Sequence, residues 1–247
     1  KVPTLIKTIN FSKPFKRVLD FYGYPKYGTI DPTFFLWLFF PPYFGIMLGD
    51  VGYALIMLII VLFFRAKFSK NEIVKDLTTI YLWALGWAIF FGFLYGEAFG
   101  ELFYKLGILK PIIHRVHSAS LIIGISILLG IVQVILGILL GIFNNLKLQD
   151  KHLALYETFR LIGVIGFIIL GLYFLRIIQI QFFLYISISL ILISVIGVIL
   201  THGLIAPIEL ISTTGQILSF ARLAAVALAS AVLAEMGNMF FSMIPSL

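Results

Sequence analysis

Five long apolar stretches occupy most of the chain, and each is long enough to cross a lipid bilayer as a helix. They cover residues 81–103, 119–143, 153–175, 182–201 and 215–240. At a rise of 1.5 Å per residue, about 20 apolar residues span the ~30 Å hydrocarbon layer. Hydrophobic residues make up 61% of the chain and charged residues only 12%, more apolar surface than one soluble core could bury. The sequence therefore predicts an all-α, multi-pass membrane protein.

A sixth apolar stretch, residues 34–64, is too long for a single crossing. Its 31 residues would form a helix of roughly 46 Å. The sequence Gly-Asp-Val-Gly at positions 49–52 interrupts it and is typical of a turn. We therefore expect a tight hairpin of two short helices, residues 34–48 and 53–64, which brings the count to about seven membrane helices. The residues assigned to this structural turn are Gly49, Asp50 and Gly52.

Lysine and arginine are unevenly distributed over the ends of these helices. With the hairpin in place, 12 of them share the side of the N-terminal segment, namely Lys1, Lys7, Lys13, Lys16, Arg17, Lys26, Arg65, Lys67, Lys70, Lys75, Lys147 and Lys151. Four lie opposite: Lys105, Lys110, Arg115 and Arg176. Because cytoplasmic loops carry the excess of positive charge, we expect the N-terminal side to be cytoplasmic. Residues 1–33, which contain four prolines, are predicted to follow the membrane surface, and residues 34–247 to form a transmembrane domain.

Arg222 stands inside the last apolar stretch, seven residues after its first residue and 18 before its last. A guanidinium at the centre of a membrane helix costs roughly 2.5 to 3.5 kcal/mol on insertion scales, and it cannot escape that cost by losing its proton. By helical rise these ends are about 10 Å and about 27 Å away, which is too far for the side chain to reach an interface easily. Residues 218–234 contain seven alanines and two serines, so another helix could approach closely. The pattern predicts a functional arginine that faces protein or water.

Two carboxylates flank Arg222 at equal separations in the sequence. Glu209 comes 13 residues before it and Glu235 comes 13 residues after it, each about 20 Å away along a helix. Together they indicate two carboxylate-lined entrances separated by an arginine, which would admit ions from both sides without a continuous pore. The alternative for each carboxylate is a solvated helix end. Glu97 and Glu101, four residues apart, are expected on one face near the end of the third helix as interfacial carboxylates.

The remaining polar residues favour structural roles. Gln133 is expected to make an interhelical hydrogen bond, and Arg160 to pair with Glu157 three residues before it. His114 and His117 are too few for a metal site. The chain has no cysteine and lacks the motifs of nucleotide hydrolysis, metalloprotease and serine hydrolase chemistry, so no cofactor, no metal, no ATP chemistry of its own and no nucleic-acid partner are expected.

Three motifs follow one another along the chain. The first comprises Asp-Phe-Tyr-Gly at positions 20–23, Asp31-Pro32 and Met-Leu-Gly-Asp-Val-Gly-Tyr at positions 47–53; the second is Gly-Phe-Leu-Tyr-Gly-Glu-Ala-Phe-Gly at positions 92–100. The third lies within residues 218–236 and places in register Ser219, Arg222, Leu223, Ala225, Leu228 and Ala229. In this order they resemble the membrane half of the a-type stator subunit, also called subunit a or subunit I, of rotary V-type and A-type ATPases.

The resemblance implies that Arg222 faces a rotating ring of small proteolipid subunits, the c or K ring, each with one buried carboxylate. Its charge would ionise that carboxylate as it passes and would block leakage between two offset half-channels. The half-channel candidates are Glu235, Asn238, Glu209, Ser230, Gln216 and Ser219. Such a subunit couples proton or sodium translocation to ATP synthesis or hydrolysis elsewhere in the complex.

The same resemblance implies further partners: membrane lipid, and a peripheral stalk and soluble ATPase subunits bound through a cytoplasmic N-terminal arm. We expect that arm, and the family's last helix, to lie outside this sequence. Tyr53, where eukaryotic members commonly have histidine, favours an archaeal or bacterial cell membrane. The residues alone leave two alternative functions open. One is a proton-coupled secondary transporter whose anionic substrate binds Arg222, with Glu97 or Glu101 coupling protons; the other is a membrane scaffold in which Arg222 forms a static ion pair.

Overall fold

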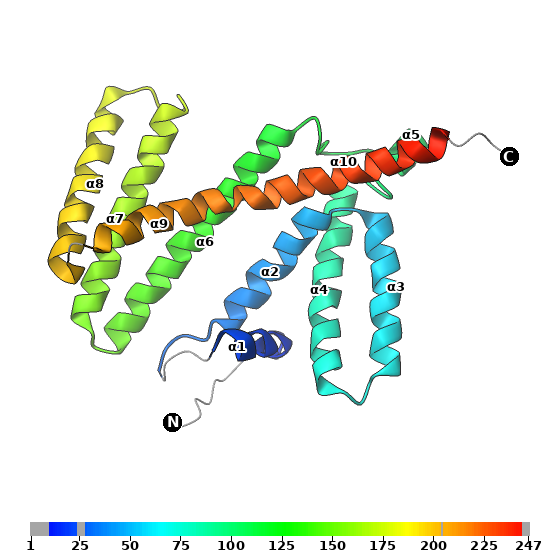
Figure 1. The fold of residues 1–247 in the computed structure, drawn as a ribbon, viewed down its shortest axis with the longest axis horizontal. Helices are drawn as coiled ribbons and strands as arrows, with labels where there is room; N and C mark the ends of the chain where they lie inside the picture. Colours follow the sequence, from blue (N-terminus) through cyan, green and yellow to red (C-terminus); the bar gives the residue numbers. More distant parts are fainter. Residues whose placement is uncertain (1–9, 24–27, 204, 244–247) are drawn as a thin grey trace. The chain divides into compact units, whose positions relative to one another are not determined.

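The computed structural model describes residues 10–23, 28–203 and 205–243, and every regular element in these ranges is helical (Figure 1). In chain order the elements are η1 (Lys13–Phe15), α1 (Lys16–Tyr22), α2 (Thr33–Leu48), α3 (Val51–Lys67), α4 (Glu72–Tyr95), α5 (Leu102–Lys105), α6 (Ala119–Lys147), α7 (Lys151–Phe174), α8 (Gln181–His202), α9 (Ala206–Ser219) and α10 (Ala221–Met243). Lys1, Lys7 and Lys26 of the basic N-terminal segment lie outside the described residues. The all-α prediction is confirmed.

Five stretches of the described chain are long and apolar enough to cross a membrane: Glu72–Tyr95, Ala119–Lys147, Lys151–Phe174, Gln181–His202 and Ala206–Phe240. The shorter helices α2 and α3 bring the total to about seven, as predicted. The fifth stretch starts nine residues before the predicted residue 215 and contains both α9 and α10. Phe220 separates these two helices but keeps right-handed dihedral angles, with φ −66° and ψ −18°.

The chain divides into two compact units. Unit 1 contains residues 1–26, Asp31–Ser126 and Arg222–Leu247, and unit 2 contains Tyr27–Ile30 and Ile127–Ala221.

In unit 1, helices α2 and α3 both pack against α4. The chain reverses between α2 and α3 at Gly49, which has a left-handed φ of +41°, and Asp50, so the predicted helical hairpin is confirmed. The two helices of the hairpin are less tightly paired than predicted, because α4 is the main packing partner of both. The buried cluster between α3 and α4 comprises Ala54, Leu85 and Ala88.

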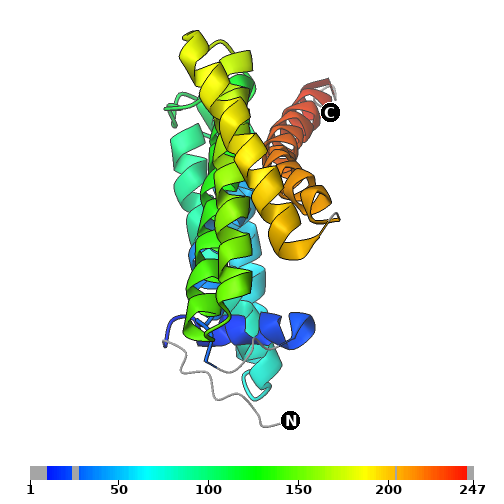
Figure 2. The same cartoon turned by 90° about the vertical axis from the view of Figure 1, so that its left-hand side faces the viewer.

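Helix α1 lies across the end of α2 and α4 within unit 1, as Figures 1 and 2 show from two directions. An ion pair fixes it there, because Arg17 Nη2 lies 3.1 Å from Asp76 Oδ2 in the first turns of α4. The described part of the N-terminal segment therefore shares an end of unit 1 with the connection between α3 and α4. The position of residues 1–33 along a membrane surface stays a prediction.

Helix α10 completes unit 1 and packs through alanine. The buried residues of its first four turns are Ala224, Ala227, Ala231 and Ala234. Their spacing of three and four residues places them on one face of the helix, and Ile122 of α6 packs against the first two. Small side chains on this face allow close approach of backbones, which is how helices associate within a membrane.

Unit 2 is built on the helix pair α7 and α8, with α9 packed against both. Its buried cluster comprises Tyr156, Val198, Ala206 and Leu210. Gly197 of α8 meets the ring of Phe159, and a Cβ atom at this glycine would lie 2.3 Å from that ring. The close packing of α7 against α8 therefore requires glycine at position 197. A second cluster joins α6, α7 and α9 through Ile138, Val164 and Ile217.

Candidate functional site

Arg222 lies in the first turn of α10, two residues after the interruption at Phe220, and its side chain is exposed. Ala225, Val226 and Ala229 are exposed on the same face, three, four and seven residues further on. The alanines of the opposite face are buried within unit 1. Helix α10 thus presents a narrow face with one cation and small side chains. The sequence predicted the small residues, but it did not predict that a helix boundary would stand next to the arginine.

The half-channel candidates that follow Arg222 on α10 contact other parts of unit 1. Asn238 donates from Nδ2 to the carbonyl oxygen of Phe99 at 2.7 Å. The hydroxyl of Ser230 lies 3.0 Å from the carbonyl oxygen of Met47, at the end of α2. Glu235 is half-buried between these two positions. The three side chains therefore line one side of α10 along about two turns.

The buried ion pair of unit 1 was not predicted. Arg115, which the sequence placed in an external loop, is 1% exposed and pairs with the buried carboxylate of Glu97. Its Nε donates to Glu97 Oε1 at 2.8 Å, and its Nη2 donates to Oε2. Its Nη1 lies within 3.3 Å of the carbonyl oxygen of Leu48, 3.2 Å of that of Ala227 and 3.2 Å of Ser230 Oγ. One guanidinium thus connects α2, the segment after α4, and α10.

The position of Arg115 suits the C-terminal end of α2. The last carbonyl groups of a helix lack intrahelical donors and carry its negative dipole end, and Leu48 is the last residue of α2. The guanidinium carbon also lies 5.0 Å from the ring centroid of Tyr95, an attractive arrangement of a cation and an aromatic face. These contacts explain how a membrane protein can bury this charge.

The expected placement of Glu97 and Glu101 on one helix face is wrong. Helix α4 ends at Tyr95, because Gly96 adopts a left-handed φ of +65° and terminates the helix. Glu97 lies in the following turn, and Glu101 precedes the short helix α5, where it pairs with Lys105 at 3.8 Å. The predicted stretch of residues 81–103 therefore extends too far toward the C-terminus. The two glycines that flank this turn in Gly-Glu-Ala-Phe-Gly were the available signal.

Asp50 organises the turn between α2 and α3. It is 2% exposed, and its carboxylate accepts three backbone hydrogen bonds, from Tyr53 at 3.0 Å, Phe99 at 3.0 Å and Gly100 at 2.6 Å. The first of these caps α3, and the others hold the segment that contains Glu97. Gly52 already belongs to α3, and a Cβ atom there would lie 2.6 Å from the Phe99 ring. The turn residues therefore also position the segment after α4.

Unit 2 contains a polar cavity of about 360 Å³. Its polar lining comprises Gln133, Glu157, Arg160, Gln216 and Ser219. Arg160 pairs with Glu157 at 3.3 Å, as predicted, and its Nε donates to Thr213 Oγ1 at 3.0 Å. Two half-channel candidates, Gln216 and Ser219, thus lie at one hollow together with a charged pair from α7.

The remaining candidate of unit 2, Glu209, lies in the first turn of α9. Its carboxylate accepts a hydrogen bond from the hydroxyl group of Tyr156, a buried residue of α7. The ring of His202 contacts the same tyrosine, with ring centroids 4.3 Å apart. Glu209 is therefore part of a polar cluster at the end of α8 and the start of α9.

Among the described residues, no group of three or more His, Cys, Asp or Glu side chains is arranged to hold a metal ion. The rings of His114 and His117 contact each other at a centroid distance of 5.4 Å. The candidate functional residues are the polar and charged side chains at helix ends and on α10.

The sequence of the chain is similar to a known protein family. Residues 1–106 match the V-type ATPase 116kDa subunit family. The A-type ATP synthase subunit I of Pyrococcus horikoshii is 32% identical over 98% of the chain, and that of Pyrococcus abyssi is 31% identical over 98%. The human V-type proton ATPase 116 kDa subunit a 3 is 25% identical over 68% of the chain.

The aligned region makes up 38% of each Pyrococcus protein and 27% of the human one. The chain thus spans well under half the length of these relatives. The three sequence motifs, the helical fold and these matches agree, and they show that the chain belongs to the V-type ATPase 116kDa subunit family, as the membrane domain of its subunit a and subunit I members.

Proposed function

We propose that the chain is the membrane-embedded stator part of a rotary ATPase and that Arg222 meets a ring of proteolipid subunits. In this role it translocates protons or sodium ions, and ATP is made or hydrolysed by other subunits. The names of its relatives, A-type ATP synthase subunit I and V-type proton ATPase subunit a, support a place in such a complex.

The observation that carries this proposal is the exposed face of α10. A guanidinium in an apolar helix is costly, and here it stands beside Ala225 and Ala229 on the face that unit 1 leaves uncovered. Small residues would let a ring helix approach closely. A passing carboxylate beside a permanent cation in a medium of low dielectric constant is favoured in its ionised form, so it would release its ion there.

Two sets of polar residues serve as the half-channels in this proposal. One set belongs to unit 1 and comprises Ser230, Glu235 and Asn238. The other belongs to unit 2 and comprises Glu209, Gln216 and Ser219, of which the last two line the polar cavity. A hydrated polar hollow is the kind of environment in which an ion can enter the membrane. The excess of Lys and Arg predicts that the N-terminal side of the membrane is cytoplasmic. We therefore assign the set of unit 2 to the cytoplasmic side and the set of unit 1 to the external side.

Co-purification tests the assignment to a rotary complex. A tagged copy of the chain, expressed in its native membrane, should come with a proteolipid ring and soluble ATPase subunits. A tagged copy that purifies without either, from membranes in which the intact complex is recovered by other means, would contradict the assignment. The role of Arg222 itself is tested by ATP-driven ion uptake of Arg222 variants.

A further inference from the structure

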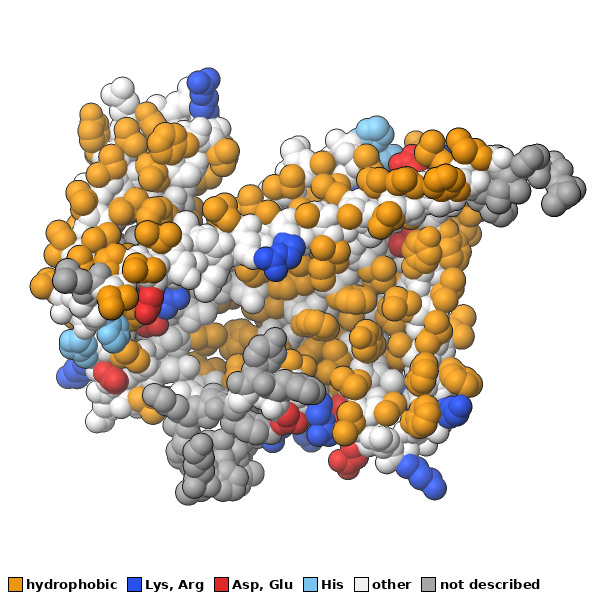
Figure 3. Space-filling view, viewed as in Figure 1, with side chains coloured by type: hydrophobic (Ala, Val, Ile, Leu, Met, Phe, Trp, Pro, Cys, Tyr) orange, Lys and Arg blue, Asp and Glu red, His pale blue; other side chains and the backbone are white. Residues whose placement is uncertain are grey.

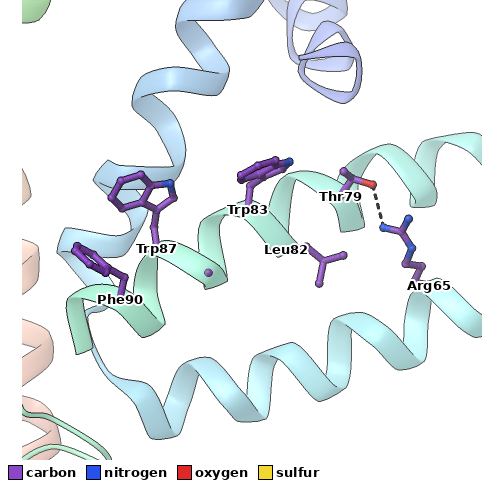
Figure 4. A pocket seen from close by; sticks show the side chains of 7 residues that line it. Arg65, Thr79, Leu82, Trp83, Trp87 and Phe90 are labelled. Carbon is purple, nitrogen blue, oxygen red and sulfur yellow. Dashed lines mark hydrogen bonds between the residues drawn. The ribbon is translucent and has the colours of Figure 1, made fainter. Parts of the chain in front are cut away.

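A groove of about 630 Å³ runs along α4 within unit 1 (Figure 4). Its apolar lining includes Trp83, Trp87 and Phe90, which project from α4 to one side, and Gly86 between them leaves space open. Apart from its two chain neighbours and the nearby backbone of α4 itself, no heavy atom of the described chain lies within 4 Å of a Cβ atom built at Gly86. The groove is therefore a hollow in the apolar surface of α4 that an added side chain could fill.

The length of the groove matches one leaflet of a bilayer. From Thr79 to Phe90 the lining residues of α4 follow one another along a single face of the helix, across 11 residue-to-residue steps. At 1.5 Å per residue this is roughly 16 Å, about half of the ~30 Å hydrocarbon thickness. An acyl chain that enters from the interface at Thr79 would thus reach the bilayer midplane near Phe90.

The interfacial end of the groove carries a cation. Arg65, near the end of α3, donates from Nη1 to Thr79 Oγ1 at 3.0 Å, as Figure 4 shows. A guanidinium has five N–H donors, and in the described part of the chain Arg65 forms no ion pair with a carboxylate. Its remaining donors fit the oxygens of a phosphate.

The surroundings of Arg65 favour an anion further. The end of unit 1 at which α3 and α4 are connected also carries Lys67, Lys70 and Lys75. Of the two carboxylates in the first turns of α4, Glu72 and Asp76, the second is paired with Arg17. Figure 3 shows hydrophobic side chains over α3 and α4, and Lys and Arg side chains near this end. An apolar hollow with a cation at its interfacial end is complementary to a lipid with a negative headgroup.

We propose that this groove is a binding site for an anionic phospholipid, whose phosphate binds Arg65 and whose acyl chain lies along Trp83, Gly86, Trp87 and Phe90. The lipid fills a hollow that would otherwise remain unpacked on the outer surface of α3 and α4. Neither Arg222 nor any half-channel candidate lines the groove.

The tryptophans of the chain allow a direct test. The sequence contains three, of which Trp83 and Trp87 line the groove, and Trp37 contacts Trp83 with ring centroids 5.6 Å apart. The full chain is reconstituted in phosphatidylcholine vesicles, and tryptophan fluorescence is measured while either dibrominated phosphatidylglycerol or dibrominated phosphatidylcholine replaces the unlabelled lipid. Bromine quenches only tryptophans that it contacts, so quenching reports occupancy of the groove.

For the unaltered chain we expect half-maximal quenching by the anionic lipid at a mole fraction about three to ten times lower than by the zwitterionic lipid, as expected for a hydrogen-bonded charge pair. Arg65→Gln should bring the two curves together. Lys67→Gln, which removes a neighbouring charge that does not line the groove, should keep them apart. Gly86→Leu should weaken quenching by both lipids, because the new side chain fills the hollow.

Circular dichroism of each variant establishes that its helices are intact before quenching is compared. Equal quenching of the unaltered chain by the two lipids would overturn the proposal, and so would a preference that survives Arg65→Gln. Protection of the tryptophans from both lipids would also overturn it and would indicate that a protein helix covers the groove.

Discussion

Arg115 and Glu97 form a buried ion pair in unit 1, although 18 residues separate them in the chain. The pair holds three segments together, because Arg115 also donates to the carbonyl oxygen of Ala227 on α10 at 3.2 Å. It therefore positions the helix that carries Arg222. Removing one member of a buried pair leaves the other charge uncompensated, which is more harmful than the loss of one contact.

We expect Arg115→Met to destabilise the chain by about 3 to 5 kcal/mol, the usual cost of breaking a buried pair. The double variant Arg115→Met with Glu97→Gln should be less destabilised, because no unpaired charge remains. Unfolding in detergent measures both. The matched control is Glu101→Gln, which breaks the partly exposed pair with Lys105 and should cost at most about 1 kcal/mol. Equal stability of Arg115→Met and Glu101→Gln would contradict this account.

Asp50 provides the second stability test. Asp50→Ala removes the acceptor of three backbone N–H groups, two of them in the segment after α4, and should cost about 2 to 4 kcal/mol. Asp150→Ala is the control, since Asp150 caps α7 with one hydrogen bond at 3.1 Å and its loss should cost only about 1 kcal/mol. If thermal unfolding ranks the two variants in the opposite order, the turn at Asp50 does not organise unit 1.

The helices of the chain were predictable because their signals are local. Long apolar runs predict spans, and the glycines around Asp50 predicted the reversal between α2 and α3. The end of α4 was missed because apolar residues continue past Gly96, and the helix stops there through backbone conformation rather than through a change in hydropathy. Two glycines flanking a carboxylate could have indicated this end.

The pairing of Glu97 with Arg115 was not predictable in the same way. Each residue taken alone is typical of a loop at the membrane surface, and only the packing of α2 and α10 encloses them. The exposure of Arg222 likewise depends on which alanines of α10 are buried. The sequence does not show this, because the two faces of an alanine-rich helix differ little in hydropathy. Tertiary contacts decide both features.

Topology can be tested by labelling, since the sequence contains no cysteine. Single cysteines at the exposed positions Phe11 and Lys70 should react with a membrane-impermeant thiol reagent from the cytoplasmic side only. A cysteine at Lys105 should react only from the opposite side. Reaction of positions 11 and 70 from different sides would exclude the proposed topology.

Glu235 tests the external half-channel. Glu235→Gln in the assembled complex should slow ATP-driven ion transport several-fold and leave assembly intact, because one carboxylate in a hydrated channel assists ion entry without being indispensable. Glu235→Asp should be milder. Glu101→Gln makes the same charge change in a loop and serves as the control. Transport at the normal rate in Glu235→Gln would identify Glu235 as a solvated side chain without a role in the ion path.

Arg222 is proposed as the barrier between the half-channels and as the charge partner of the ring. Ala or Gln at this position removes the permanent cation, so the ring carboxylate should stay protonated as it passes. Lys is more strongly hydrated and can lose its proton when desolvated, so Arg222→Lys should be severely impaired. Two controls separate charge from packing: Val226→Ala on the same face of α10, and Arg176→Ala in the connection between α7 and α8.

The most direct measurement is ATP-driven ion uptake by reconstituted vesicles, with a gel of subunit composition for each preparation. We expect a fully assembled Arg222→Ala complex to show uptake at background level, while Val226→Ala and Arg176→Ala retain near-normal uptake. Near-normal uptake by a fully assembled Arg222→Ala complex would contradict the proposed mechanism.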